Sequence, residues 1–121
     1  MKSIIYFVSE DWYFCSHRLP IARKALADGF KVVVITRINK HGDIIKSEGF
    51  ELESIEIKRG GVNLVSEFKT LFALYSCYKK YNPDIAHHVA LKPVIYGTLV
   101  ARFIGSIKIV NAMAGLGFVF I

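Results

Sequence analysis

Hydrophobic and polar positions alternate along the chain in two kinds of block. Unbroken apolar runs such as Ile4–Val8 and Val32–Ile35 are typical of strands that are buried on both faces. Between the runs lie segments whose apolar residues recur three and four positions apart, as in a helix with one buried face. The pattern predicts strands at Lys2–Ser9, Lys31–Thr36, Glu51–Ile57, Asp84–His88 and Lys108–Asn111. It predicts helices at Leu19–Ala27, His41–Glu48, Asn63–Tyr81 and Lys92–Ile104.

This alternation of strands and helices indicates an α/β fold, a Rossmann-like parallel sheet of about five strands flanked by helices and joined by right-handed crossovers. We expect the third, second, first, fourth and fifth strands to lie side by side in that order. The order reverses between the first and fourth strands, and sheets of this kind bind ligands at the carboxyl ends of the strands beside such a reversal. The segments Ser9–His17 and His87–Pro93 are therefore expected to share one crevice.

Length and composition limit the classes of partner. The 121 residues suffice for one domain, 1–121. The net charge of +6 can attract anions such as phosphates or an acidic membrane face, although a soluble protein with solvated lysines fits the same charge better. Nucleic acid is not expected, because the lysines are scattered and form no basic stripe. The sequence has no apolar run of the ~18 residues that a spanning helix needs, and no secretory signal. Cys15 and Cys77 form no disulfide framework, so we expect a cytoplasmic protein.

The segment after the first strand carries several candidate binding groups. The carboxylates of Glu10 and Asp11 can accept sugar hydroxyls or act as a base, although solvated loop acids fit the pattern as well. Trp12 can stack on a sugar or pack beneath its loop. His17 and Arg18 lie where a helix is expected to start, and free backbone N–H groups favour an anion there. His17 fits a plain surface position equally well.

The segment after the fourth strand carries paired histidines. Neighbouring residues of a strand point to opposite faces, so one of His87 and His88 should line the crevice and the other should be a hydrogen-bonded core residue. The pattern does not say which, and both are candidate catalytic residues. Lys92 can meet a phosphate or carboxylate at the next helix start, or remain solvated. We expect neither a metal site nor a cofactor, because no HxH, HExxH or CxxC pattern occurs.

Three blocks of sequence resemble a known family. They are EDWYFCSHRLP from Glu10, PDIAHHVALKP from Pro83 and NAMAGLGFVF from Asn111. Together, and in this order, they resemble the N-terminal part of a bacterial branch of the family 4 glycosyltransferases, which are retaining enzymes of the GT-B fold. The resemblance covers nearly all of the chain and implies the N-terminal half-domain of that fold. We count Asn111, Gly115 and Gly117 in the third block among the substrate-binding residues.

The resemblance also implies what the chain lacks. Such enzymes have two Rossmann-like domains that face each other across a cleft. The N-terminal domain binds the acceptor, often a lipid-linked sugar at the cytoplasmic membrane face, and the C-terminal domain binds the nucleotide-sugar. A histidine at the end of the fourth strand lies near the transferred sugar. The chain is thus expected to serve capsule, O-antigen or similar glycan synthesis, to need a missing C-terminal domain and to be inactive alone.

Two features depart from the simplest form of this interpretation. The first loop has none of the glycines that family members often carry there, which puts phosphate binding by that loop in doubt. The apolar tail Phe118–Ile121 is expected to need a cover, either the missing domain or a second copy in a homodimer. An alternative function is a non-catalytic acceptor-binding or membrane-docking subunit of a split glycosyltransferase.

Two other classes with this alternation fit poorly. A phosphoacceptor receiver domain needs an aspartate at the end of the third strand, where this chain has Ile57 and Lys58. A nicotinamide-binding domain needs a glycine-rich first turn, which is absent.

Overall fold

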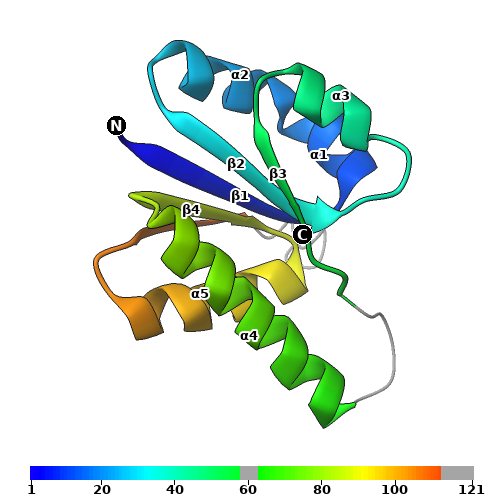
Figure 1. Cartoon of the computed structure of the whole chain (residues 1–121), viewed down its shortest axis with the longest axis vertical. Coiled ribbons are helices and arrows are strands. Elements are labelled where there is room, and N and C mark those ends of the chain that lie inside the picture. The colour runs from blue at the N-terminus through cyan, green and yellow to red at the C-terminus, as the bar shows by residue number, and fades with distance from the viewer. Residues whose placement is uncertain (58–62, 113–121) are drawn as a thin grey trace, which may run out of the picture.

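The computed structural model describes residues 1–57 and 63–112, and in this part of the chain five strands form one sheet (Figure 1). The strands are β1 (Ser3–Glu10), β2 (Lys31–Arg37), β3 (Glu51–Ser54), β4 (Ile85–Val89) and β5 (Lys108–Ala112). Their order across the sheet is β3-β2-β1-β4-β5, which confirms the predicted order. Each neighbouring pair is parallel, so the carboxyl ends of the strands lie at one edge of the sheet.

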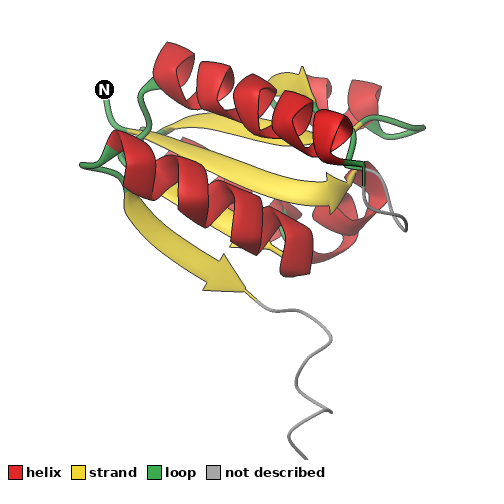
Figure 2. Ribbon diagram, turned by 90° about the horizontal axis from the view of Figure 1, so that it is seen from below, coloured by secondary structure: helices red, strands yellow, loops and turns green. Residues whose placement is uncertain are grey.

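Helices cover both faces of the sheet (Figure 2). On one face lie α1 (Asp11–His17), α2 (Leu19–Ala27) and α3 (Gly42–Ser47), and on the other lie α4 (Leu64–Tyr81) and α5 (Leu91–Ile104). Within the described residues, 1–57 and 63–112, no helix is both long enough and apolar enough to cross a bilayer. The layers therefore form the α/β architecture that the alternation predicts.

The central strand β1 is buried on both faces, as its unbroken apolar run predicts. Ile5 and Phe7 belong to the core cluster that also contains Leu74 of α4. Tyr6 points the other way and belongs to the cluster that contains Phe14 of α1. Each layer of helices is thus held to the same strand by alternate side chains.

The segment after β1 differs from the predicted loop. β1 continues to Glu10, and Asp11–His17 forms the short helix α1. The Asp11 carboxylate accepts a hydrogen bond from the backbone N–H of Trp12 at 2.8 Å, which satisfies one of the free donors at the helix start. Phe14 is fully buried beneath the helix and fixes it to the sheet.

Strand β3 is shorter than the predicted Glu51–Ile57. Its pairing with β2 ends where Ser54 lies opposite Thr36, one residue before β2 itself ends. Ile55 and Ile57 are still buried, although they lie beyond the ladder. The hydrophobic pattern therefore continues past the strand, which is why the sequence overestimates its length.

The limits of α4 follow from local chemistry. The Asn63 side chain accepts hydrogen bonds from the backbone N–H groups of Val65 (3.1 Å) and Ser66 (3.4 Å), as expected of an N-cap. Asn82 ends the helix in the left-handed conformation with φ 44°, and Pro83 cannot continue it. Both ends of this helix agree with the sequence prediction.

Candidate functional site

The carboxyl ends of β1 and β4 bring the two predicted segments to one edge of the sheet. In the parallel pairing of these strands Val8 lies opposite Val89. Helix α1 begins three residues after Val8, and α5 begins two residues after Val89. Both segments therefore start at the same edge, beside the reversal of strand order, as the sequence predicts.

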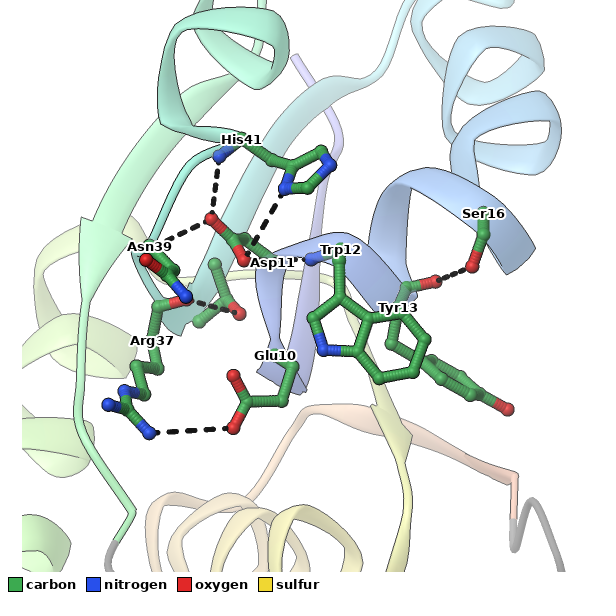
Figure 3. Close-up of polar contacts among 9 residues, drawn as sticks. Glu10, Asp11, Trp12, Tyr13, Ser16, Arg37, Asn39 and His41 are labelled. Carbon is green, nitrogen blue, oxygen red and sulfur yellow. Dashed lines mark hydrogen bonds and ion pairs between the residues drawn. The ribbon is translucent and has the colours of Figure 1, made fainter.

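The Asp11 side chain lies inside this edge and has no exposed surface (Figure 3). Besides the Trp12 bond, its carboxylate accepts hydrogen bonds from the backbone N–H groups of Asn39 at 2.7 Å and His41 at 2.9 Å. Burial alone would raise the pKa of Asp11, but these backbone donors outweigh it and hold the pKa below its usual value. Asp11 therefore ties the start of α1 to the loop after β2 and presents no atom to a ligand.

Glu10 ends β1 beside a cation that the sequence interpretation did not include. Its Oε1 lies 3.8 Å from Nη1 of Arg37, the last residue of β2 (Figure 3). Arg37 also approaches Glu56, at 3.7 Å. Residues that end parallel strands lie at the carboxyl edge of the sheet. Because Arg37 follows the second predicted strand as Glu10 follows the first, the sequence could have predicted both residues at this edge.

Aromatic rings gather on α1 at the same edge. The Trp12 side chain is 49% exposed, and its ring meets that of Tyr13 edge to face at 5.6 Å. Tyr13 in turn stacks on His17 with 4.1 Å between ring centroids. His17 is exposed, and its Nδ1 lies 2.7 Å from the Ser16 hydroxyl. We call Trp12, Tyr13 and His17 the aromatic shelf; its stacked rings are geometrically suited to a flat or ring-shaped ligand.

His88 is a core residue, as predicted for one of the two histidines. It is fully buried, with Nε2 2.7 Å from the Tyr78 hydroxyl and Nδ1 2.8 Å from Oδ1 of Asn111. Because Asn111 Oδ1 can only accept, Nδ1 carries the hydrogen, and Nε2 accepts from Tyr78. Burial lowers the pKa of His88 to about 4, although the Asn111 bond opposes the shift. Asn111 also donates to Thr98 Oγ1 of α5 at 3.0 Å, and Asn111 is itself exposed, so it links His88 to α5 at the surface.

His87 points to the opposite face, toward α1 and α2. Its ring lies 5.3 Å from that of Tyr6. It lines a cavity of about 290 Å³ whose walls include Ile4 and Ile85, near the amino ends of β1 and β4, so this cavity lies away from the carboxyl edge that carries Glu10 and Trp12. Burial lowers the pKa of His87, and the positive charge of Arg18 lowers it further. Among the residues that the structure describes, His87 Nε2 and Arg18 Nε are the buried side-chain nitrogens and oxygens without a hydrogen-bond partner. Such atoms call for a polar ligand or a water molecule.

The remaining predicted residues lie apart from this group or outside the description. Lys92 is the second residue of α5, and its Nζ lies 3.8 Å from Glu67 of α4. Gly115 and Gly117 fall outside the described residues. Within residues 1–57 and 63–112, no three His, Cys, Asp or Glu side chains gather closely enough to hold a metal ion.

The fold has clear counterparts among solved structures. MurG from Acinetobacter baumannii matches with a TM-score of 0.72 at 18% identity, over 92% of this chain and 34% of MurG. A glycosyltransferase from Rickettsia africae ESF-5 matches at 0.66 and 17%, over 91% of this chain and 29% of its own. The UDP-GlcNAc 2-epimerase of Methanocaldococcus jannaschii matches at 0.64 and 20%, over 98% and 33%. The chain thus spans about a third of the length of these proteins.

At these identities the structural likeness shows the fold, a Rossmann-like half-domain of the GT-B type. No curated protein matches the chain in sequence. The model of the glycosyl transferase 4-like family, however, matches residues 3–120. That match takes in every strand and helix described above, and the protein belongs to the glycosyl transferase 4-like family.

Proposed function

We propose that this chain is the acceptor-binding part of a glycosyltransferase that moves a sugar from a nucleotide-sugar to a lipid-linked or polysaccharide acceptor, as in capsule or O-antigen synthesis. Family membership supports sugar transfer as the reaction. The observation that carries the acceptor role is the half-exposed Trp12 ring, two residues from Glu10 at the carboxyl end of β1. An aromatic face packs against the apolar face of a sugar ring, and a carboxylate accepts its hydroxyl hydrogens.

In this proposal His87, and not His88, lies near the transferred sugar. Both ring nitrogens of His88 are already hydrogen-bonded to other residues of the chain. The Nε2 atom of His87 is buried without a partner, and so is the Nε atom of Arg18. A bound hydroxyl or phosphate oxygen would satisfy the Arg18 donor, and a hydroxyl would satisfy either tautomer of a neutral His87.

The residues that bind the nucleotide-sugar would lie mainly in protein outside this chain. The matched solved structures are about three times as long, and the archaeal one is named for a UDP-sugar. The helix start after β1 carries an aromatic shelf instead of glycines, so little backbone is free to surround a diphosphate. The 121-residue chain alone should bind nucleotide-sugars poorly and transfer no sugar.

The single tryptophan of the chain makes the proposal testable by fluorescence, because Trp12 lies in the candidate site itself. We would titrate the chain with short-chain, water-soluble lipid-phosphate sugars, with oligosaccharides and with UDP-GlcNAc. An acceptor-type ligand should give a saturable change in Trp12 emission. Glu10→Gln should weaken that binding about tenfold, the effect of one lost charge-assisted hydrogen bond.

The matched control is Glu51→Gln, which removes the same charge at the amino end of β3 and should leave the titration unchanged. Tight binding of UDP-GlcNAc by the chain would overturn the acceptor-side assignment. A lack of response to every sugar-bearing acceptor, or equal losses in both variants, would overturn the site.

A further inference from the structure

The end of β1 is shifted in register so that a carboxylate lies opposite a guanidinium. Phe7 lies opposite Ile35 of β2, whereas Glu10 lies opposite Arg37, so the ladder slips by one residue between these two pairs. Without the slip Glu10 would lie opposite Ile38, which follows the last residue of β2. Irregularities of this kind change the direction of a side chain and are frequent beside binding sites. Here the slip places Glu10 and Arg37 next to each other at the carboxyl edge of the sheet.

The two charged groups are close without a direct hydrogen bond between them. Arg37 Nη1 lies 3.8 Å from Glu10 Oε1, and Arg37 Nε lies 3.7 Å from Glu56 Oε1, both beyond the length of an N–H···O hydrogen bond. The Arg37 side chain is 48% exposed, so a ligand can reach its N–H groups. Figure 3 shows the Glu10 carboxylate between the Arg37 guanidinium and the Trp12 indole. The pair therefore lies beside the aromatic shelf.

A single hydroxyl group fits between these two side chains. An oxygen about 2.8 Å from each of two atoms that are 3.8 Å apart can accept from the Arg37 guanidinium and donate to the Glu10 carboxylate. Both bonds are charge-assisted, and each polarises the hydroxyl in favour of the other. A water molecule can fill the same position, and a sugar hydroxyl replaces it without losing either bond. A carboxylate cannot, because it only accepts and would face the negative charges of Glu10 and Glu56.

We propose that Glu10 and Arg37 together hold one hydroxyl of a neutral acceptor sugar and select this sugar over an acidic one such as a uronic acid. The Trp12 ring packs against the sugar ring in this arrangement. The inference rests on the proposed function and names the class of sugar that the acceptor presents. Because one hydroxyl joins both side chains, the contributions of Glu10 and Arg37 to binding are coupled.

Titration of Trp12 fluorescence with matched neutral and acidic sugars tests the selection. The probes are mannotriose with trimannuronate, and cellotriose with the glucuronate trimer of the same linkage. Each uronate carries carboxylates where its neutral counterpart has hydroxymethyl groups. The unchanged chain should bind at least one neutral sugar, and should bind the matching uronate about tenfold more weakly or worse. Glu10→Gln should narrow this difference, because it removes one of the repelling charges.

Variants of Arg37 test its part in the site. Arg37→Gln should weaken binding of the neutral sugar about tenfold, and Arg37→Lys, which keeps a charged donor, should weaken it less. Glu10→Gln combined with Arg37→Gln should weaken binding by well under the roughly hundredfold product of the two single losses. The matched control is Arg23→Gln, which removes the same charge from α2, where Arg23 lies 2.6 Å from Glu48. It should leave every titration unchanged.

The outcomes separate this inference from the function on which it rests. Uronates that bind as tightly as the neutral sugars, or an unchanged affinity in Arg37→Gln, would overturn the inference alone. So would single losses that multiply fully in the double variant, because they would show two separate contacts, and equal losses in Arg23→Gln, because they would show an effect of net charge. A response to lipid-phosphate sugars but to neither neutral trisaccharide would also overturn it alone. No response of Trp12 to any sugar would overturn both.

Discussion

Replacing Asp11 with asparagine changes one buried atom and tests how the carboxyl edge of β1 is held in place. The Asp11 carboxylate accepts hydrogen bonds from the backbone N–H groups of Trp12, Asn39 and His41 at 2.8, 2.7 and 2.9 Å. Asparagine keeps the shape of the side chain but presents an NH₂ donor in place of one oxygen. Since all three partners are donors, at least one backbone N–H must then face another donor.

The size of the effect follows from the bonds that each orientation loses. One oxygen accepts from both Asn39 and His41, so the better orientation of the amide keeps these two and loses the bond from Trp12. A hydrogen bond to a charged group contributes about 1.5–3 kcal/mol, and a buried donor without a partner costs about 1–3 kcal/mol. We expect Asp11→Asn to lower the free energy of unfolding by about 3 kcal/mol at pH 7. For a domain of this size, that lowers Tm by roughly 10 °C.

Denaturant unfolding followed by circular dichroism measures this loss. The control is Asp28→Asn, whose half-exposed carboxylate contacts Lys24 at 2.9 Å, and which should cost less than about 0.5 kcal/mol. The pKa of Asp11 is lowered in the folded protein, so its stabilisation is present above the unfolded pKa and is lost as the pH falls through the folded one. The two proteins should therefore differ fully near neutral pH and converge in strong acid. If Asp11→Asn were as stable as the control, the carboxylate would not hold this edge.

Three further predictions use the same unfolding assay. Gly97→Ala should destabilise the chain by about 1–3 kcal/mol despite the better helix propensity of alanine, because the new Cβ would overlap the His88 ring; unchanged stability would contradict this packing. The protonation of His88 should by itself lower the free energy of unfolding by about 3 kcal/mol from pH 7 to pH 4. A histidine in the unfolded chain binds a proton over this range, whereas folded His88, with its pKa of about 4, stays largely neutral. His88→Gln should flatten this dependence more than His87→Gln, and the reverse order would be inconsistent with the buried ring. Ala90→Gly should raise stability by about 1 kcal/mol, because Ala90 has φ 80° and ψ 166°, a region that suits glycine; Ala73→Gly inside α4 should lower it by a similar amount.

The strand order was predictable because its signals are local. The runs in β1 and β2 are fully apolar, which requires cover on both faces, and alternation with helices then leaves few topologies. The short helix α1 was not predictable in the same way. Its start depends on bonds from Asp11 to Asn39 and His41, which lie 28 and 30 residues away in the chain. The seven residues of α1 contain no local pattern that predicts contacts so distant in the sequence.

The candidate site shows the same division between local and distant information. The two-residue period of a strand predicts that His87 and His88 point to opposite faces, and the structure confirms it. Which histidine enters the core was beyond the sequence, because it depends on Tyr78 of α4 and Asn111 of β5 reaching the same ring. The burial of Asp11 was hidden for the same reason. An acid after a strand has the same local pattern whether it meets solvent or three backbone donors.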